Sequence, residues 1–165
     1  MSLTSATSRD QKAAIHAAGS AARVLLSTLP KSDQDLDISK KADGSLVSNA
    51  DLASQRVIQD VLGPLNIPIL SEEAAAPHYS TRKDWTRFWL VDPLDGTESC
   101  LKNPTGFALN NSLCDQTGPI FGVVADPLAN RMFMGGVEVP IQIAPLDGST
   151  IRQIHPSAIQ RPYRM

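Results

Sequence analysis

Two stretches of the chain carry apolar residues at helical spacing. In residues 8–29 these positions recur every three or four residues, which predicts a helix that ends before Pro30. The alanine content of this stretch suggests close packing on another helix or on a sheet. A second helical pattern begins after Ser48, a good N-cap residue, and runs to about Leu62, where Gly63-Pro64 stops it.

Shorter apolar runs bounded by turn residues predict strands. Residues 38–47 read as an extended pair that turns at Asp43-Gly44. Residues 67–71 and 88–91 each read as a short buried strand. The later part of the chain predicts successive strands of a meander followed by one last hairpin, over residues 107–113, 120–126, 131–135, 137–143 and 150–154.

The connecting segments carry less information. Residues 74–84 read as a polar loop, and residues 98–102 as about one helical turn. The tail over residues 156–165 has too little apolar content to form a layer of its own. We therefore expect a single domain over residues 1–165, long enough to bury a substantial core.

Two of the predicted buried strands run directly into acidic residues. Residues 67–71 lead into Glu72-Glu73, and residues 88–91 lead into Asp92-Pro93-Leu94-Asp95. Acids at the end of a buried strand are costly unless a positive group lies between them, and a divalent cation suits carboxylate and carbonyl oxygens. Taken singly, each set is equally compatible with an ordinary turn or a solvated surface. Their coincidence on two strands indicates a ligand site, because ligands bind at that edge of open α/β sheets.

Composition and charge exclude several classes of partner. The chain has 165 residues and a net charge of −2, from 15 basic and 17 acidic residues without a block of like charges. This balance favours neither a nucleic-acid groove nor contact with an anionic membrane surface. No apolar run approaches the length of a membrane span, and residues 1–20 lack the apolar core of a signal peptide. Cys100 and Cys114 favour two free thiols in a reducing cytosol over a disulfide between them. Together these observations lead us to expect a soluble, cytoplasmic protein.

Several short motifs, in a fixed order, are similar to those of one family. Residues 41–51 match the segment K-x-D-x-S-P-V-T-x-A-D, with Leu46 and Ser48 in place of the proline and the threonine. Residues 89–97, W-L-V-D-P-L-D-G-T, are typical of the same proteins, as are Gly106-Phe107 with Asn110 and the strand around Gly122-Val123-Val124. The chain resembles the inositol monophosphatase superfamily, and within it the 3′(2′),5′-bisphosphate nucleotidase branch. These are Mg²⁺-dependent, lithium-sensitive phosphomonoesterases.

The resemblance implies a fold and a metal site. The fold would be layered α/β, the N-terminal half of the inositol monophosphatase and fructose-1,6-bisphosphatase-like fold, with two helices packed on a mainly antiparallel sheet. Glu72, Asp92 and the carbonyl of Leu94 would hold one Mg²⁺, while Asp92 and Asp95 would hold a second. Such a pair of ions activates water and stabilises the leaving oxygen in phosphate ester hydrolysis.

The resemblance also implies catalytic and substrate-binding residues. Thr97, hydrogen-bonded to Asp51, would orient and deprotonate the attacking water. The backbone N–H groups of Gly96 and Thr97 would receive the phosphate. From the local sequence alone, Asp51 reads instead as the third helical residue of a capping box with Ser48, and that interpretation is the stronger one on local grounds.

The chain departs from the family in one segment. Family members continue into a second portion with a W-D-x-x-A-G segment, whose aspartate completes the second metal site. Here Trp85 and Trp89 are the only tryptophans, followed by Thr86 and Leu90, and the sequence ends at Met165.

Three hypotheses follow: a shortened phosphatase, a protein that recovers the missing part by self-association as a homodimer, or a non-catalytic metal-binding or regulatory module. The implied substrate is a small phosphorylated metabolite. A 3′,5′-bisphosphorylated nucleotide such as 3′-phosphoadenosine 5′-phosphate is the first choice, and an inositol monophosphate or a sugar bisphosphate is the alternative.

Overall fold

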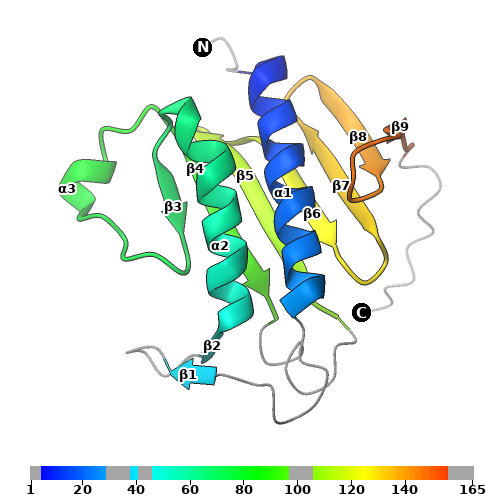
Figure 1. Cartoon of the computed structure of the whole chain (residues 1–165). Coiled ribbons are helices and arrows are strands. Elements are labelled where there is room, and N and C mark those ends of the chain that lie inside the picture. The colour runs from blue at the N-terminus through cyan, green and yellow to red at the C-terminus, as the bar shows by residue number, and fades with distance from the viewer. Residues whose placement is uncertain (1–4, 29–37, 41–45, 97–105, 156–165) are drawn as a thin grey trace, which may run out of the picture.

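The protein is a layer of two helices packed on one face of a sheet (Figure 1). The computed structural model describes residues 5–28, 38–40, 46–96 and 106–155, with the backbone alone for 38–40 and 46–48. Helix α1 spans Ser8–Thr28 and helix α2 spans Asn49–Leu62, which confirms both predicted helices. A short 3₁₀ helix, Gly63–Leu65, follows α2, where the sequence predicted a stop.

The sheet is mainly antiparallel and has seven strands in the order β3-β4-β5-β6-β7-β8-β9. The exception is β3, which pairs parallel with β4 and lies at the edge. The predicted meander and the last hairpin are confirmed by strands β5 to β9. The strands are β3 (Ile69–Ser71), β4 (Arg87–Asp95), β5 (Ala108–Asp115), β6 (Gly118–Asp126), β7 (Arg131–Gly136), β8 (Val139–Ala144) and β9 (Arg152–Gln153).

A separate two-stranded sheet precedes α2. Strands β1 (Ile38–Lys40) and β2 (Leu46–Ser48) pair antiparallel, which confirms the predicted extended pair. Its predicted turn at Asp43-Gly44 lies outside the described residues, as do the predicted helical turn over 98–102 and the tail over 156–165.

The structure corrects three of the local predictions. The strand predicted over 88–91 runs on to Asp95, and Leu90 on it is 47% exposed, because the helices cover only one face of the sheet. The strand predicted as buried over 67–71 is only half-buried apart from Ser71, because β3 is an edge strand. The loop predicted over 74–84 contains a short helix, α3 (Tyr79–Arg82), whose N-terminus His78 caps.

The hydrophobic core lies between the helices and the sheet. Helix α1 packs on β5, β6 and β7, α2 packs on β4 and β3, and the two helices contact each other. The inner face of α1 is built mostly from alanine, which lets its backbone approach the sheet closely. Its buried small residues are Ala14, Ala17, Ala18, Gly19, Ala21 and Ala22.

At Gly19, helix α1 approaches the backbone around Leu146 closely. A Cβ atom at this position would overlap the backbone carbonyl of Leu146 and would lie 3.5 Å from the Cε atom of Met132. The carbonyl of Leu146 also accepts a hydrogen bond of 2.8 Å from Nη1 of Arg23, one turn further along the helix. The position of α1 therefore depends on a residue without a side chain.

Replacing Gly19 with alanine is expected to lower the free energy of unfolding by about 1–3 kcal/mol, because backbone cannot move aside as a flexible side chain can. Thermal unfolding of the variant measures this loss. The matched control is Gly63→Ala, where an added Cβ meets nothing within 4 Å. Equal midpoints for the Gly19 variant and the unaltered chain would contradict the close packing described above.

Candidate functional site

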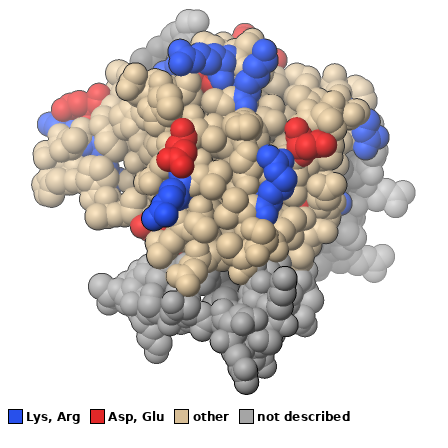
Figure 2. Space-filling model, viewed as in Figure 1, with Lys and Arg blue, Asp and Glu red and all other residues tan. Residues whose placement is uncertain are grey.

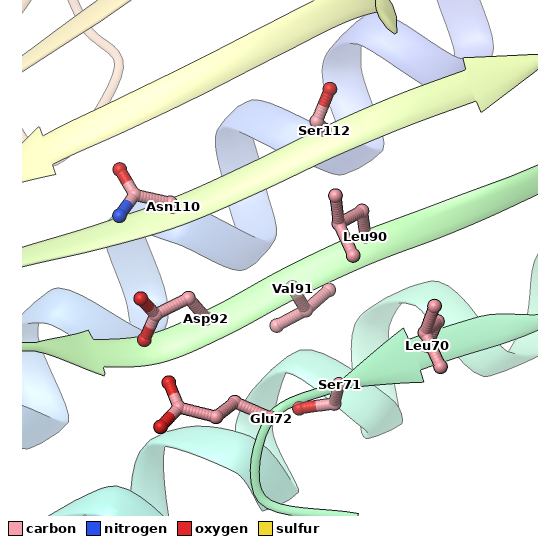
Figure 3. A pocket seen from close by; sticks show the side chains of 8 residues that line it. All are labelled: Leu70, Ser71, Glu72, Leu90, Val91, Asp92, Asn110 and Ser112. Carbon is pink, nitrogen blue, oxygen red and sulfur yellow. The ribbon is translucent and has the colours of Figure 1, made fainter. Parts of the chain in front are cut away.

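The parallel pairing of β3 with β4 brings two acidic residues together. Ser71 lies opposite Val91 in the register, so the next residues along the two strands are Glu72 and Asp92. The backbone N–H of Glu72 donates to the carbonyl of Val91 at 3.1 Å, which fixes the end of β3 beside β4. Figure 3 shows the carboxyl groups of Asp92 and Glu72 next to each other at the neighbouring strand ends.

A β-bulge in β4 turns Asp95 to the same face as Asp92. Asp92 pairs with Asn110 and Asp95 pairs with Ala108, so three steps along β4 match two steps along β5. Residues three apart on a regular strand point to opposite faces, whereas one extra residue in a bulge restores the same direction. Both aspartates therefore project from the face that the helices leave uncovered. There Nδ2 of Asn110 donates to Oδ2 of Asp95 at 3.4 Å.

The carboxyl groups of this site repel one another. Burial, followed by the negative charges of Glu72 and Asp95, raises the pKa of Asp92 to about 6. A hydrogen bond between the side chains of Asp92 and Glu72 raises this pKa further, while the N–H of Leu94, 3.2 Å from Oδ1 of Asp92, lowers it. A cation bound between these groups would favour their ionised forms.

The residues present fit a hard divalent cation. In the described part of the chain no three His, Cys, Asp or Glu side chains are grouped as ligands of one ion. Glu72 and Asp92 are nevertheless in contact, and Asp95 acts on Asp92 through its charge. Mg²⁺ prefers oxygen ligands and keeps several waters, so one or two carboxylates are enough to hold it. The donor set of Glu72, Asp92 and Asp95 suits that requirement.

The raised pKa of Asp92 predicts how the effect of Mg²⁺ on protein stability should depend on pH. The folded-state pKa of Asp92 lies above its ordinary value of 3.8, so the metal-free protein binds this proton more tightly when folded. This contribution to stability is present at low pH and is lost as the pH rises through about 6. Mg²⁺ bound by Asp92 would compete with the proton, so its stabilising effect should appear above about pH 6 and fade below it.

Melting temperatures with Mg²⁺ and with a chelator, measured between about pH 5 and about pH 7.5, check this expectation. Adding Mg²⁺ should raise the melting temperature by a large amount at the highest pH and by a small amount at the lowest pH. A rise of equal size across the range would show that the proton on Asp92 does not compete with the metal.

An open hollow lies on the sheet beside the two strand ends (Figure 3). Its volume is about 410 Å³, and its lining combines the two acids with apolar and amide groups of β3, β4 and β5. The helix ribbons lie behind these strands in the same view, so the hollow opens on the uncovered face. The lining residues are Leu70, Ser71, Glu72, Leu90, Val91, Asp92, Asn110 and Ser112.

The other residues implied by the family resemblance are placed only in part. Asp51 lies in the first turn of α2, as a capping box requires, and is 0% exposed. Gly96 has a φ of 91°, a conformation that favours glycine, and it ends the acidic strand in a turn. Thr97 and the side chain of Ser48 lie outside what the structure describes, so the pairing of Thr97 with Asp51 stays a prediction.

Two buried polar residues of α2 were missed by the sequence reasoning. The hydroxyl of Ser54 donates to the carbonyl of Pro93 at 2.9 Å, and Oε1 of Gln55 accepts from Oγ of Ser71 at 2.5 Å. A signal was present, because the inner face of this helix carries Ser54 and Gln55 where its period calls for apolar residues. Both contacts lead to the strand ends that carry the acids.

The rest of the surface adds two observations. On the face covered by α1 and α2, the basic and acidic side chains that are described are few and interspersed (Figure 2). This face therefore presents no patch of one sign. Within the described residues, no helix is both long enough and apolar enough to cross a membrane.

Sequence comparison relates the chain to nucleotidases of bacteria. The chain is similar to the 3′(2′),5′-bisphosphate nucleotidase CysQ of Shigella flexneri, with 46% identity over 100 residues. It is 45% identical over 100 residues to the enzyme of the same name from Escherichia coli K12. In each case the matched stretch covers 59% of this chain and 40% of the relative, so the chain spans well under two thirds of these relatives.

Solved structures share the fold described above. CysQ from Bacteroides thetaiotaomicron, a bacterial member of the inositol monophosphatase family, superposes with a TM-score of 0.69 at 30% identity, over 81% of this chain and 48% of that one. The extragenic suppressor protein suhB from Bartonella henselae gives a TM-score of 0.70 at 26% identity, over 79% of this chain and 50% of that one. The sequence model of the inositol monophosphatase family matches residues 7–149, so this chain belongs to that family.

Proposed function

We propose that this chain carries the metal-binding part of a Mg²⁺-dependent phosphomonoesterase, with a 3′(2′),5′-bisphosphate as its substrate. The observation that carries the proposal is the meeting of Glu72 and Asp92 at the ends of two parallel strands, with Asp95 turned to the same face. The nucleotidase names of the relatives support this choice of substrate over an inositol monophosphate.

The acidic residues of the site would bind the metal ion of such a reaction. Glu72, Asp92, Asp95 and the carbonyl of Leu94 would hold Mg²⁺. Bound Mg²⁺ supplies Lewis acidity, which neutralises charge on the phosphate and lowers the pKa of water. The carboxylates compensate the charge of the cation and fix its place beside the open hollow, where a phosphate ester has room.

The remaining roles fall to the turn after β4 and to the start of α2. Thr97 would hold the attacking water through a hydrogen bond, and the buried carboxylate of Asp51 would accept the proton through Thr97. The backbone N–H groups of Gly96 and Thr97 would bind the phosphate oxygens. Burial of Asp51 supports this proposal, since a purely solvated capping residue would not be 0% exposed.

Phosphate release tests the proposal directly. The chain is incubated with Mg²⁺ and either 3′-phosphoadenosine 5′-phosphate or an inositol monophosphate, with and without Li⁺. We expect Mg²⁺-dependent release from the bisphosphate, and inhibition by Li⁺. Mg²⁺ binding without release from either compound would instead support a non-catalytic metal-binding module.

A further inference from the structure

Helix α2 places two buried polar side chains against the strand ends that carry the acids. Ser54 is 0% exposed and Gln55 is 6% exposed, and each makes a hydrogen bond to a different strand. A buried polar group costs free energy unless it is paired, and an apolar residue would fill the same space without that risk. The groups to which these two side chains bond therefore indicate why polar residues occupy these buried positions.

Ser54 holds the bulge. Pro93 and Leu94 lie between the paired positions Asp92 and Asp95, so this part of β4 has no regular partner on β5. The carbonyl of Pro93 instead accepts the hydroxyl of Ser54 at 2.9 Å. The hydrogen bond thus ends on a backbone atom between the two aspartates, and the bulge that it stabilises sets their common direction.

Gln55 holds the end of the edge strand. Its Oε1 accepts from Oγ of Ser71, and the same Oγ lies 3.4 Å from the backbone N–H of Glu73, which donates to it. Glu72 lies between Ser71 and Glu73 in the sequence, so this contact restrains the backbone on both sides of it. Because β3 is short and has a partner on one side only, this side-chain contact adds to the few bonds that place Glu72.

We infer that Ser54 and Gln55 are positioning residues, which set the relative placement of Glu72, Asp92 and Asp95 and thereby the affinity for Mg²⁺. The inference rests on the proposed function. It assigns to α2 a role at the site beyond that of Asp51, because one helix fixes both strand ends at once. Partners of metal ligands typically change metal affinity by about 10–100-fold when they are removed.

The test compares Ser54→Ala with Ile58→Val, a change one turn further along the same buried face. Both variants lose a modest part of the stability of α2, through a hydrogen bond or a methyl group. Two quantities are measured: Mg²⁺ affinity by calorimetry, and hydrogen exchange of the Leu94 amide in the metal-free protein. Ser54→Ala should weaken Mg²⁺ binding at least about tenfold and speed the exchange of Leu94, whereas Ile58→Val should change neither by more than about twofold.

Gln55 is tested through its partner. Gln55→Leu and Ser71→Ala should each weaken Mg²⁺ binding, because each removes the contact between Gln55 and Ser71, and Ser71→Ala also removes the acceptor of the Glu73 N–H. The double variant should therefore bind no more weakly than Ser71→Ala alone. Equal effects of Ser54→Ala and Ile58→Val, or no effect of Ser54→Ala, would overturn the inference. If the unaltered chain does not bind Mg²⁺, the proposed function fails, while the exchange rate of Leu94 still decides whether Ser54 positions the bulge.

Discussion

Replacing Asp92 with asparagine is expected to abolish Mg²⁺ binding and, at the same time, to stabilise the metal-free protein. The two effects have one cause. Asp92 lies between the charges of Glu72 and Asp95, and its pKa is raised to about 6, so its ionised form is costly at neutral pH without a cation. Asparagine has the same shape and keeps an oxygen for the N–H of Leu94, but it removes the negative charge.

The expected magnitudes differ greatly between the two effects. Mg²⁺ affinity and phosphate release should fall by more than about a hundredfold, beyond the loss caused by removing an outer partner of a ligand. The free energy of unfolding without metal should rise by about 1 kcal/mol at neutral pH, a figure already reduced for the screening of a half-exposed group by solvent. Calorimetric titration and thermal unfolding with a chelator measure the two quantities.

The matched control for this experiment is Asp84→Asn, an exposed aspartate in the loop before β4. It should leave both Mg²⁺ affinity and stability near those of the unaltered chain. If Asp92→Asn destabilised the metal-free protein and kept the stabilising effect of Mg²⁺, the carboxylate cluster would not be a metal site.

Replacing Asp51 with asparagine is expected to reduce phosphate release by about 10²–10⁴-fold, the range contributed by proton transfer to a positioned base. Mg²⁺ affinity should stay within about threefold, because in the proposed mechanism Asp51 would act on the water through Thr97 and not on the metal. This separation of activity from metal affinity is the opposite of the pattern expected for Asp92. Phosphate release and calorimetric titration of the same variant measure it.

Two further variants make the test specific. Asp60→Asn changes an exposed acid on the same helix and should leave activity unaltered. Thr97→Ala should lower phosphate release about as much as Asp51→Asn, and the double variant should be little worse than either, since the proposal has the two residues act as a unit. Independent, multiplying losses would show that Asp51 and Thr97 do not act through one contact, and unchanged phosphate release by Asp51→Asn would leave Asp51 with the capping role alone.

The helices and the meander could be predicted because local patterns determine them. Short stretches of sequence contain the signals for these elements. They are the helical spacing of apolar residues in α1, the N-cap residue before α2, and the turn residues between β5, β6 and β7. The sequence also predicted that acidic residues would lie close together, since two successive predicted strands ended in carboxylates. In the structure the first pair, Glu72 and Asp92, meets because β3 and β4 are parallel.

The details that shape the site depend on contacts distant in sequence. A spacing of three between Asp92 and Asp95 predicts opposite faces on a regular strand, and only pairing with β5 reveals the bulge. The half-buried state of β3 follows from its place at the edge of the sheet, which no local pattern records. The role of Ser54 depends on a bond across 39 positions of the chain.

The edge position of β3 has a consequence for how the site responds to heat. Glu72 follows a strand of three residues with one neighbour, whereas Asp92 and Asp95 belong to a strand of nine residues with a neighbour on each side. Short edge segments open in local fluctuations well before the whole domain unfolds. The carboxylate cluster would thus separate in a sub-global step, so a cation held there would be lost at a temperature below that at which the chain melts.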